Sequence, residues 1–165
     1  MITCFAWNIQ AQDAITKFFG KYENDTDFTN VSISQRMFGL MTNLEMDDPE
    51  DQAISDAISK LTGLKILAKE DTDQAKALYQ EAFRLIPAKD YDELMSVRSE
   101  DKNMKFLIKE SGGTINELLM VMGGDREFFI LSIVGDIDLQ QIAKISQALD
   151  IDGLDNLERL DNSEN

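Results

Sequence analysis

Carboxylates are the side chains of this sequence best suited to chemistry, and they gather in three short stretches. These stretches are "MDDPED" (46–51), "GDIDLQQ" (135–141) and "ALDIDGLDNLE" (148–158). The first two come where a helix is expected to start, and Pro49 suits a first helical position. Because helix N-termini favour negative side chains, capping explains Asp136 and Asp138 without any catalytic role.

The third stretch resembles a calcium loop only in part. A calcium loop carries ligands at alternating positions, glycine at the sixth position and glutamate at the twelfth. Counted from Asp150, Gly153 stands at the fourth position. We therefore predict that Asp150, Asp152 and Asp155 are solvated, and we predict no metal site.

Other familiar chemistries are missing from the sequence. There is no histidine, and the single cysteine is Cys4, which excludes Ser–His–Asp and Cys–His catalysis and the usual zinc sites. The glycine-rich stretches "SGGT" and "GGDR" lie between predicted strands, whereas a phosphate-binding loop opens a helix and ends in Lys-Ser or Lys-Thr. We predict no catalytic residue and no cofactor site.

One enzymatic alternative uses only carboxylates. A carbohydrate hydrolase needs two carboxylates facing each other across a cleft, and 31 acidic residues could supply them. The only tryptophan, Trp7, falls in the opening segment, so the usual sugar-stacking side chain is missing from the rest of the chain. A carboxylate-based hydrolase is therefore the second hypothesis.

The charge of the chain limits its partners. The net charge of −15 repels phosphate backbones and anionic membrane surfaces, so we expect no nucleic-acid partner. No run of about 18 apolar residues is present, so no transmembrane segment is predicted.

The opening segment, residues 1–11, carries no charged side chain. Its apolar "ITCFAW" followed by small Ala11 is typical of the end of a signal peptide, although the basic start is missing. We interpret it as the tail of a signal peptide, with the mature domain starting at Gln12. An ordinary N-terminal strand or helical turn is one alternative, and a lipid-bearing Cys4 is another.

The first half of the chain is predicted to contain both helices and strands, which must position any site. Helical spacing of apolar residues predicts helices over 13–22, 36–44, 49–61 and 72–86. Their inward residues include Ile15, Phe18 and Phe19 in the first helix and Ala75, Leu78, Tyr79, Ala82 and Leu85 in the fourth. The second is expected to place Met37, Phe38, Leu40 and Met41 on one face, and the third to bury Ala53, Ile54, Ala57, Ile58 and Leu61. Short strands are predicted over 29–34 and 63–70.

The pattern changes to alternation after residue 92. It predicts a four-stranded antiparallel meander over 93–99, 104–110, 115–122 and 127–135, joined by tight turns. A helix to about residue 149 and a short one over 154–160 follow. With a two-residue turn at the centre of each connection, Val97 faces Phe106, Phe106 faces Leu119, and Leu119 faces Ile130.

The other face of this meander is a candidate partner surface. It is apolar at Leu118, Met120, Met122, Phe129, Leu131 and Ile133, and basic at Arg98, Lys105 and Lys109. Six large apolar side chains are unfavourable in water. Either an element of the same chain covers them, or they bind another protein or a second copy of this chain.

Three stretches carry a resemblance to a known family. They are "FTNVSISQRMFGLM" (28–41), "YDELMSVRSEDKNMKFLIKESGGTINELLMVMGG" (91–124) and "FFILSIVGDIDLQQIAKISQAL" (128–149). In apolar positions and turns the chain resembles the secreted Bacteroidetes proteins grouped as domain-of-unknown-function family 4252. The resemblance implies an exported protein of the cell envelope, and it carries over no catalytic or ligand-binding residue.

Together these patterns predict an α+β protein: a four-stranded antiparallel meander in the C-terminal half, with one or two N-terminal strands and about five helices. Residues 12–160 form one domain and 161–165 a polar tail. The expected function is that of a periplasmic or otherwise exported envelope protein that acts by binding, in a structural or regulatory role.

Overall fold

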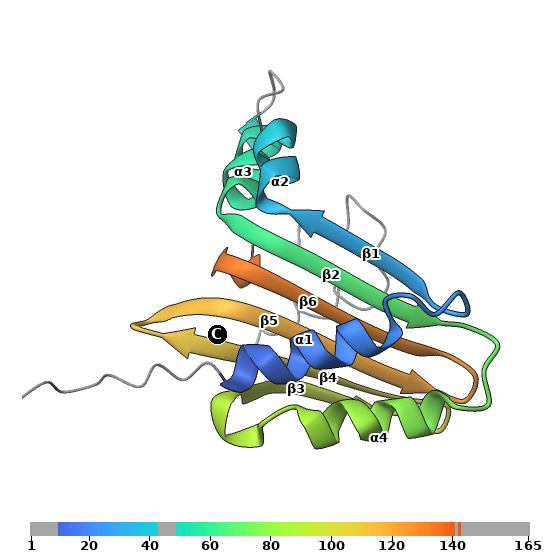
Figure 1. Cartoon of the computed structure of the whole chain (residues 1–165). Coiled ribbons are helices and arrows are strands. Elements are labelled where there is room, and N and C mark those ends of the chain that lie inside the picture. The colour runs from blue at the N-terminus through green and yellow to red at the C-terminus, as the bar shows by residue number, and fades with distance from the viewer. Residues whose placement is uncertain (1–9, 43–48, 141, 143–165) are drawn as a thin grey trace, which may run out of the picture. The chain divides into compact units, whose positions relative to one another are not determined.

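A computed structural model of the chain shows an α+β fold built on one six-stranded antiparallel sheet (Figure 1). The structure describes residues 10–42, 49–140 and 142. The strands follow the order β1-β2-β6-β5-β4-β3 across the sheet. Their bounds are β1 Thr29–Ser34, β2 Leu61–Lys69, β3 Asp92–Arg98, β4 Lys102–Ser111, β5 Thr114–Gly124 and β6 Phe128–Ile137.

The described residues hold four α-helices and one short 3-10 helix, η1 (Ala88–Asp90). The α-helices are α1 Gln10–Tyr22, α2 Gln35–Met41, α3 Pro49–Ser59 and α4 Ala75–Leu85. The predicted helix to residue 149 and the short one over 154–160 lie outside the described part, apart from a first helical turn near residue 140. The predicted meander corresponds to β3–β6, which are neighbours in one larger sheet that also includes β1 and β2.

The chain divides into two compact units. The first comprises residues 1–31, 66–109 and 119–131, and the second comprises 32–65, 110–118 and 132–165. The predicted domain limits at 12 and 160 stay predictions.

The core of the first unit lies between helices α1 and α4 and the strands that they cover. The two helices contact each other and run side by side (Figure 1). Phe18 of α1 is fully buried, with its ring centroid 5.8 Å from that of Phe128. Of the inward residues predicted for α1, Ile15, Phe18 and Phe19 are confirmed, since all three are buried. The buried members of this core are Ile15, Phe18, Phe19, Phe28, Leu67, Ala75, Leu78, Ala82, Ile86, Tyr91, Leu107, Leu119, Val121, Phe128 and Ile130.

Helix α4 differs from its prediction at one apolar position. Ala75, Leu78 and Ala82 are buried as predicted, but Leu85 is 37% exposed. The helix ends at Leu85, and Ile86 continues in extended conformation and is buried instead. This change of backbone direction before Pro87 moves the next core position by one residue.

The helices of the second unit bury less than predicted. On α2, Phe38 is buried, whereas Met37 is 50% and Leu40 is 60% exposed. A helix of seven residues makes only about two turns, so it presents few residues on any one face. On α3, Ala57 and Ile58 are buried as predicted.

Gly135 of β6 belongs to the second unit and has a backbone φ of +154°. A Cβ at this position would lie 2.5 Å from the carbonyl oxygen of Lys60 and 2.7 Å from the Cα of Leu61. The Asp136 N–H donates to the same Lys60 carbonyl at 3.1 Å. Only glycine permits this close approach of β6 to the start of β2.

The three turns of the meander are tight, and one is placed as predicted. Gly112 and Gly113 have φ of +64° and +80°, as a two-residue hairpin turn with both central residues at positive φ requires. At the first turn, the Ser99 N–H donates to the Lys102 carbonyl at 2.9 Å, so the central residues are 100–101 rather than 101–102. At the third, the Gly124 N–H donates to the Glu127 carbonyl, so the central residues are 125–126 rather than 124–125.

The first turn moves the predicted register by two residues. Val97 pairs with Met104, and Met95 pairs with Phe106; the predicted pairing of Val97 with Phe106 is wrong. A shift of two does not change which residues of β3 and β4 share a face, because the side chains of a strand alternate with period two. The pairing then becomes irregular between Glu93 and Met95.

Strand β4 presents the opposite face to the one predicted. Leu107, not Phe106, joins Leu119 and Val121 in the core beneath α1 and α4. The reason is visible in β5, where four consecutive side chains, Leu118 to Val121, are all 0% exposed. A strand that is apolar on both faces does not specify its register by alternation.

Candidate functional site: a basic groove beside helix α4

An open groove lies in the first unit, between the exposed side of α4 and strands β3, β4 and β5. Its volume is about 920 Å³. It combines basic, aromatic and amide side chains, and none of the described residues that line it is acidic. These residues are Lys76, Tyr79, Gln80, Phe83, Arg84, Arg98, Ser99, Asn103, Lys105 and Gly123.

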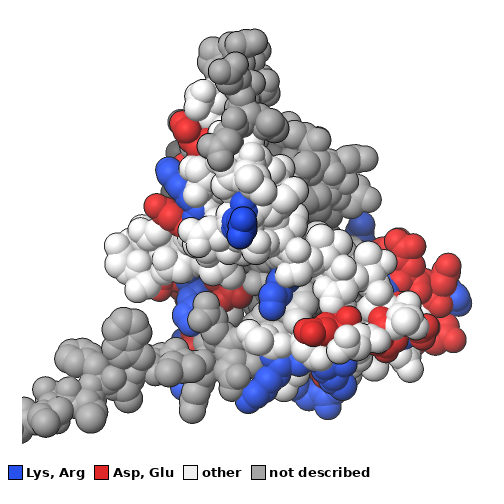
Figure 2. All heavy atoms as spheres, turned by 45° about the horizontal axis from the view of Figure 1, so that its top comes forward, with Lys and Arg blue, Asp and Glu red and all other residues white. Residues whose placement is uncertain are grey.

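The four cations of the groove differ in how they are paired. Lys76 Nζ lies 3.2 Å from Asp125 Oδ1, and Lys105 Nζ lies 2.5 Å from Glu93 Oε2. Arg84 and Arg98 are exposed and make no ion pair within the described part of the chain. Figure 2 shows that charge is unevenly spread, with basic side chains in the lower part of the drawn face and acidic ones at its right-hand end.

Two aromatic rings lie between these cations. The ring centroids of Tyr79 and Phe83 are 4.8 Å apart with planes tilted by 57°, and Lys105 Nζ lies 5.6 Å from the Phe83 centroid. Both rings are half-buried and pack on the core of the first unit. A Cβ at Gly123 would lie 2.7 Å from Tyr79 Cβ. The missing side chain of Gly123 therefore lets α4 approach β5 and sets the position of the Tyr79 ring.

The Tyr79 hydroxyl is influenced by the cations around it. Burial raises the pKa of Tyr79 above its ordinary value of 10.0, and the nearby charges of Lys105 and Arg98 oppose that rise in part. The hydroxyl is therefore protonated at neutral pH and can donate a hydrogen bond. Arg98, Lys105 and Tyr79 all line the same groove.

This arrangement is suited to holding an anion. Guanidinium groups stay charged at all physiological pH values and bind carboxylates with two parallel hydrogen bonds. Aromatic rings beside them offer an apolar surface. Among the described residues, the groove lining contains no Asp or Glu, so these residues do not supply the pair of carboxylates that a glycoside hydrolase requires.

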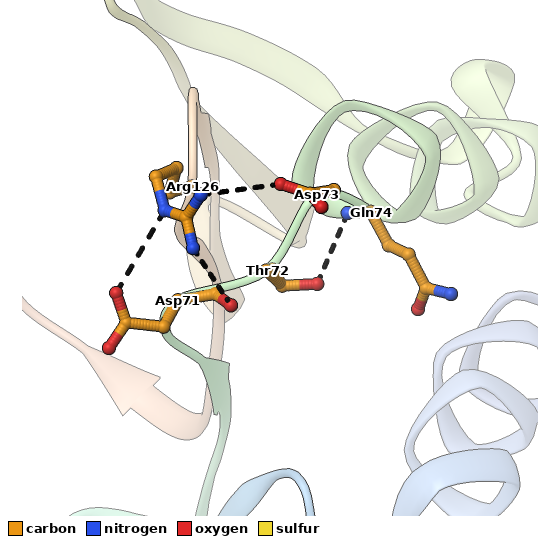
Figure 3. Close-up of polar contacts among 5 residues, drawn as sticks. All are labelled: Asp71, Thr72, Asp73, Gln74 and Arg126. Carbon is orange, nitrogen blue, oxygen red and sulfur yellow. Dashed lines mark hydrogen bonds and ion pairs between the residues drawn. The ribbon is translucent and has the colours of Figure 1, made fainter.

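A second hollow of about 490 Å³ is rich in carboxylates, but its main contacts are structural. It is lined by Glu70, Asp71, Asp101, Lys102, Asp125, Arg126 and Glu127. Figure 3 shows Arg126, from the β5–β6 turn, reaching the loop before α4. Arg126 Nη1 lies 3.4 Å from Asp73 Oδ1, and Arg126 Nε lies 3.9 Å from Asp71 Oδ1.

Backbone contacts complete this clamp. The Thr72 N–H donates to the Arg126 carbonyl at 2.9 Å. The Gln74 N–H donates to Thr72 Oγ1 at 3.1 Å (Figure 3). Asp71 has a φ of +49°, the one positive φ outside glycine in the described residues. The clamp therefore holds the chain in a tight bend where it enters α4, the helix that forms one wall of the groove.

The structure separates the residues of the predicted partner surface. Leu118, Met120 and Leu131 are 0% exposed and Ile133 is 3% exposed, while Met122, Phe129 and Lys109 are partly buried. Arg98 and Lys105 line the groove beside α4, together with Gly123. Because β4 presents the opposite face to the predicted one, these two cations do not share a face with Leu118 and Met120.

The predicted carboxylate stretches are only partly within the described residues. Asp138 Oδ1 accepts a hydrogen bond from the Gln140 N–H at 3.0 Å, which confirms its capping role. The capping role predicted for Asp136 is wrong, because Asp136 lies within strand β6. Asp150, Asp152 and Asp155 lie outside the described part. Among the described residues, no three Asp, Glu, His or Cys side chains come together in a way that could hold a metal ion.

Sequence reasoning missed the groove because it assigned Tyr79 to the core and left Phe83 and Arg84 unassigned. A signal was nevertheless present on α4. Lys76, Gln80 and Arg84 recur every four residues and Tyr79 and Phe83 lie between them, which places basic and aromatic side chains on one helical face.

The comparisons with known proteins support the family and no particular activity. No helix in the described residues combines the length and the apolar character needed to cross a membrane. Comparison with curated proteins found no match, and comparison with solved structures found none either. The model of one family, described as Domain of unknown function (DUF4252), matches residues 22–145, a range that includes every residue lining the groove. The chain therefore belongs to the DUF4252 family.

Proposed function

We propose that this protein is an exported, non-enzymatic protein of the cell envelope that binds another protein through the basic groove. The observation that carries the proposal is the pair Arg84 and Arg98, which have no ion-pair partner in the described residues although acidic residues outnumber basic ones by 31 to 16. In so acidic a chain, exposed arginines that form no direct ion pair are suited to an outside partner. Their neighbours Tyr79 and Phe83 add the aromatic surface that protein interfaces favour.

Binding is favoured over hydrolysis by the chemistry of the groove. A glycoside hydrolase needs two carboxylates in its cleft, and the described residues that line this groove include neither Asp nor Glu. Export is supported by the uncharged, leader-like composition of residues 1–11. These two supports are independent of each other and need separate tests.

The binding role is tested by affinity capture from a cell-envelope extract, with mass spectrometry of the retained proteins. The test variant carries Arg84→Glu and Arg98→Glu. The control carries Arg36→Glu and Lys89→Glu, which change the net charge equally at exposed positions outside the groove. We expect one partner to be retained by the wild type and the control and lost by the groove variant. Equal retention by both variants would contradict a role for the groove.

Export is tested by fractionating cells and sequencing the N-terminus of the native protein. We expect recovery from the envelope or periplasmic fraction with Gln12 as the first residue. A native protein that begins at Met1 would contradict the proposed cleavage.

A further inference from the structure

The cations of the groove are spread along α4 instead of surrounding one point. Lys76, Gln80 and Arg84 lie one turn apart on α4 and all line the groove. At a rise of 1.5 Å per residue, Lys76 and Arg84 are separated by about 12 Å along the helix axis. A single carboxylate or phosphate reaches one end of this row, whereas a chain with several carboxylates can follow it.

The opposite wall carries its cations on two neighbouring strands. Arg98 of β3 pairs with Asn103 of β4, and Ser96 pairs with Lys105. Arg98 and Lys105 are therefore diagonal neighbours on one face, which in an antiparallel pair are about 7–8 Å apart. Arg98 is the cation of this wall without an ion pair, since Lys105 contacts Glu93.

The aromatic side chains of the groove lie between its cations along α4. Tyr79 and Phe83 are in contact with each other and with the core of the first unit. Tyr79 packs closely against Gly123, and the two rings form an apolar surface between Lys76 and Arg84 on α4. An occupant that matches this wall alternates acidic groups with an apolar or aromatic side chain.

The size of the groove agrees with an extended occupant. Its volume of about 920 Å³ is at the upper end of small-molecule pockets, which range over about 300–1,000 Å³. An extended chain rises about 3.3 Å per residue, so about four residues span the distance from Lys76 to Arg84.

We infer that the groove binds an extended acidic segment of a partner protein, with two or more carboxylates placed on either side of an apolar or aromatic side chain. The inference rests on the proposed binding function and specifies its partner. Arg84 and Arg98 each bind a carboxylate of the segment, and the central side chain packs on Tyr79 and Phe83. Charge attraction then speeds association and makes it sensitive to salt.

The test is fluorescence anisotropy of the full chain with a fluorescein-labelled peptide of eight residues, in which Asp and Glu surround a central Phe. A matched peptide replaces every Asp and Glu by Asn and Gln. We expect the acidic peptide to bind, and to bind at least tenfold more weakly to the Arg84→Glu, Arg98→Glu variant and at high salt. The Arg36→Glu, Lys89→Glu control should bind it as the wild type does.

Two further experiments distinguish binding of an acidic segment from binding of a single anion, and loss of binding from misfolding of the variant. Benzoate and inorganic phosphate are added as competitors; displacement of the peptide at equal concentration would overturn the inference in favour of a single-anion site. The milder Arg84→Gln, Arg98→Gln variant, with an unchanged urea midpoint, should also bind more weakly. Equal binding of the neutral peptide would overturn the inference.

The failure of this inference can be distinguished from failure of the proposed function. If affinity capture retains a partner that needs Arg84 and Arg98 but the acidic peptide does not bind, the acidic segment is wrong and the binding function stands. If neither a captured partner nor the peptide depends on these arginines, both proposals fall.

Discussion

At the scale of single residues, Glu81 is the carboxylate that joins the two helices over the core. Lys21 Nζ donates to Glu81 Oε1 at 2.5 Å, and Tyr22 Oη donates to Glu81 Oε2 at 2.9 Å. Burial acts to raise the pKa of Glu81, but the hydrogen bonds from Lys21 and Tyr22 outweigh it, and the pKa is lowered from 4.5. The ionised carboxylate is therefore the form that the folded protein stabilises.

The first prediction follows from this direction. Because the folded pKa lies below the unfolded one, the contribution of Glu81 to stability is present above about pH 4.5 and is lost as the pH falls through the folded pKa. We expect Glu81→Gln to lower the free energy of unfolding at pH 7 by less than about 1 kcal/mol, because Lys21 is largely exposed. Urea unfolding at pH 7 and at pH 3 measures this.

The difference between wild type and Glu81→Gln should shrink at pH 3. Tyr22→Phe, which removes one of the two hydrogen bonds, should lower stability at pH 7 by a smaller amount. If the difference in free energy of unfolding between wild type and Glu81→Gln is the same at both pH values, ionised Glu81 does not stabilise the folded protein.

The second prediction concerns Gly135. A Cβ there meets the backbone of Lys60 at 2.5 Å, and the φ of +154° adds strain for any other residue. We expect Gly135→Ala to reduce the free energy of unfolding by about 1–3 kcal/mol or more. Gly20→Ala is the matched control, since no atom lies within 4 Å of its added Cβ; in the exposed part of helix α1 it should stabilise by up to about 1 kcal/mol. Thermal melting of both variants tests this. A similar loss of stability in both would show that the effect comes from replacing glycine by alanine in general and not from strain at Gly135.

At the scale of elements, the bend before α4 depends on the one described non-glycine residue at positive φ. Asp71 tolerates a φ of +49° better than alanine does. Asp71 and Asp73 each contact Arg126 and are about 95% and 94% exposed, so the ion pairs themselves contribute little.

The third prediction compares these two aspartates. Asp71→Ala should destabilise by about 1–2 kcal/mol more than Asp73→Ala, since only the first substitution adds backbone strain. Asp71→Gly should recover most of that loss, because glycine adopts positive φ without cost from a Cβ. Equal urea midpoints for Asp71→Ala and Asp73→Ala would show that the bend is not strained.

The fourth prediction concerns strand β5. Met120 is fully buried, so Met120→Glu places a carboxylate in the core, and we expect a loss of about 4 kcal/mol or more in the free energy of unfolding. Met37→Glu is the control, at a side chain 50% exposed, and should change stability by less than about 0.5 kcal/mol. Thermal melting and light scattering together test the alternative. If Met120→Glu loses self-association while its melting temperature is unchanged, Met120 belongs to a partner surface and not to the core.

Local sequence patterns predict most of the described helices and strands. They do not predict which residues from distant parts of the chain come together in the groove. Gly112 and Gly113 marked their turn because both need positive φ. The face of β4 was wrong because β5 is apolar on both sides, so that alternation carried no information about register. The groove is lined by Arg84 of α4 and by Arg98 of β3, and which strand face lies beside α4 depends on that register. The sequence therefore predicts the basic and aromatic face of α4 but not the opposite wall of the groove.

At the scale of the whole molecule, the charge of −15 contrasts with the basic groove, whose described lining residues include no Asp or Glu. A strongly acidic surface disfavours association with acidic partners in general. An acidic segment could then bind only where the cations gather, and the net charge would restrict it to the groove. If the groove binds an acidic segment as we propose, the overall acidity contributes to the specificity of that binding.

The short turns of the meander have a consequence for the order of folding. The hairpins of β3–β6 close loops of two residues, whereas the Lys21–Glu81 contact joins positions 60 residues apart and closes a far longer loop at a higher entropy cost. We expect Ile130→Val to slow refolding and Ile15→Val mainly to speed unfolding, measured by stopped-flow kinetics in urea. Similar effects of both on the refolding rate would show that α1 is already packed in the transition state. In the expected order, α1 precedes the hairpins along the chain yet gains a surface to pack against only after they have formed.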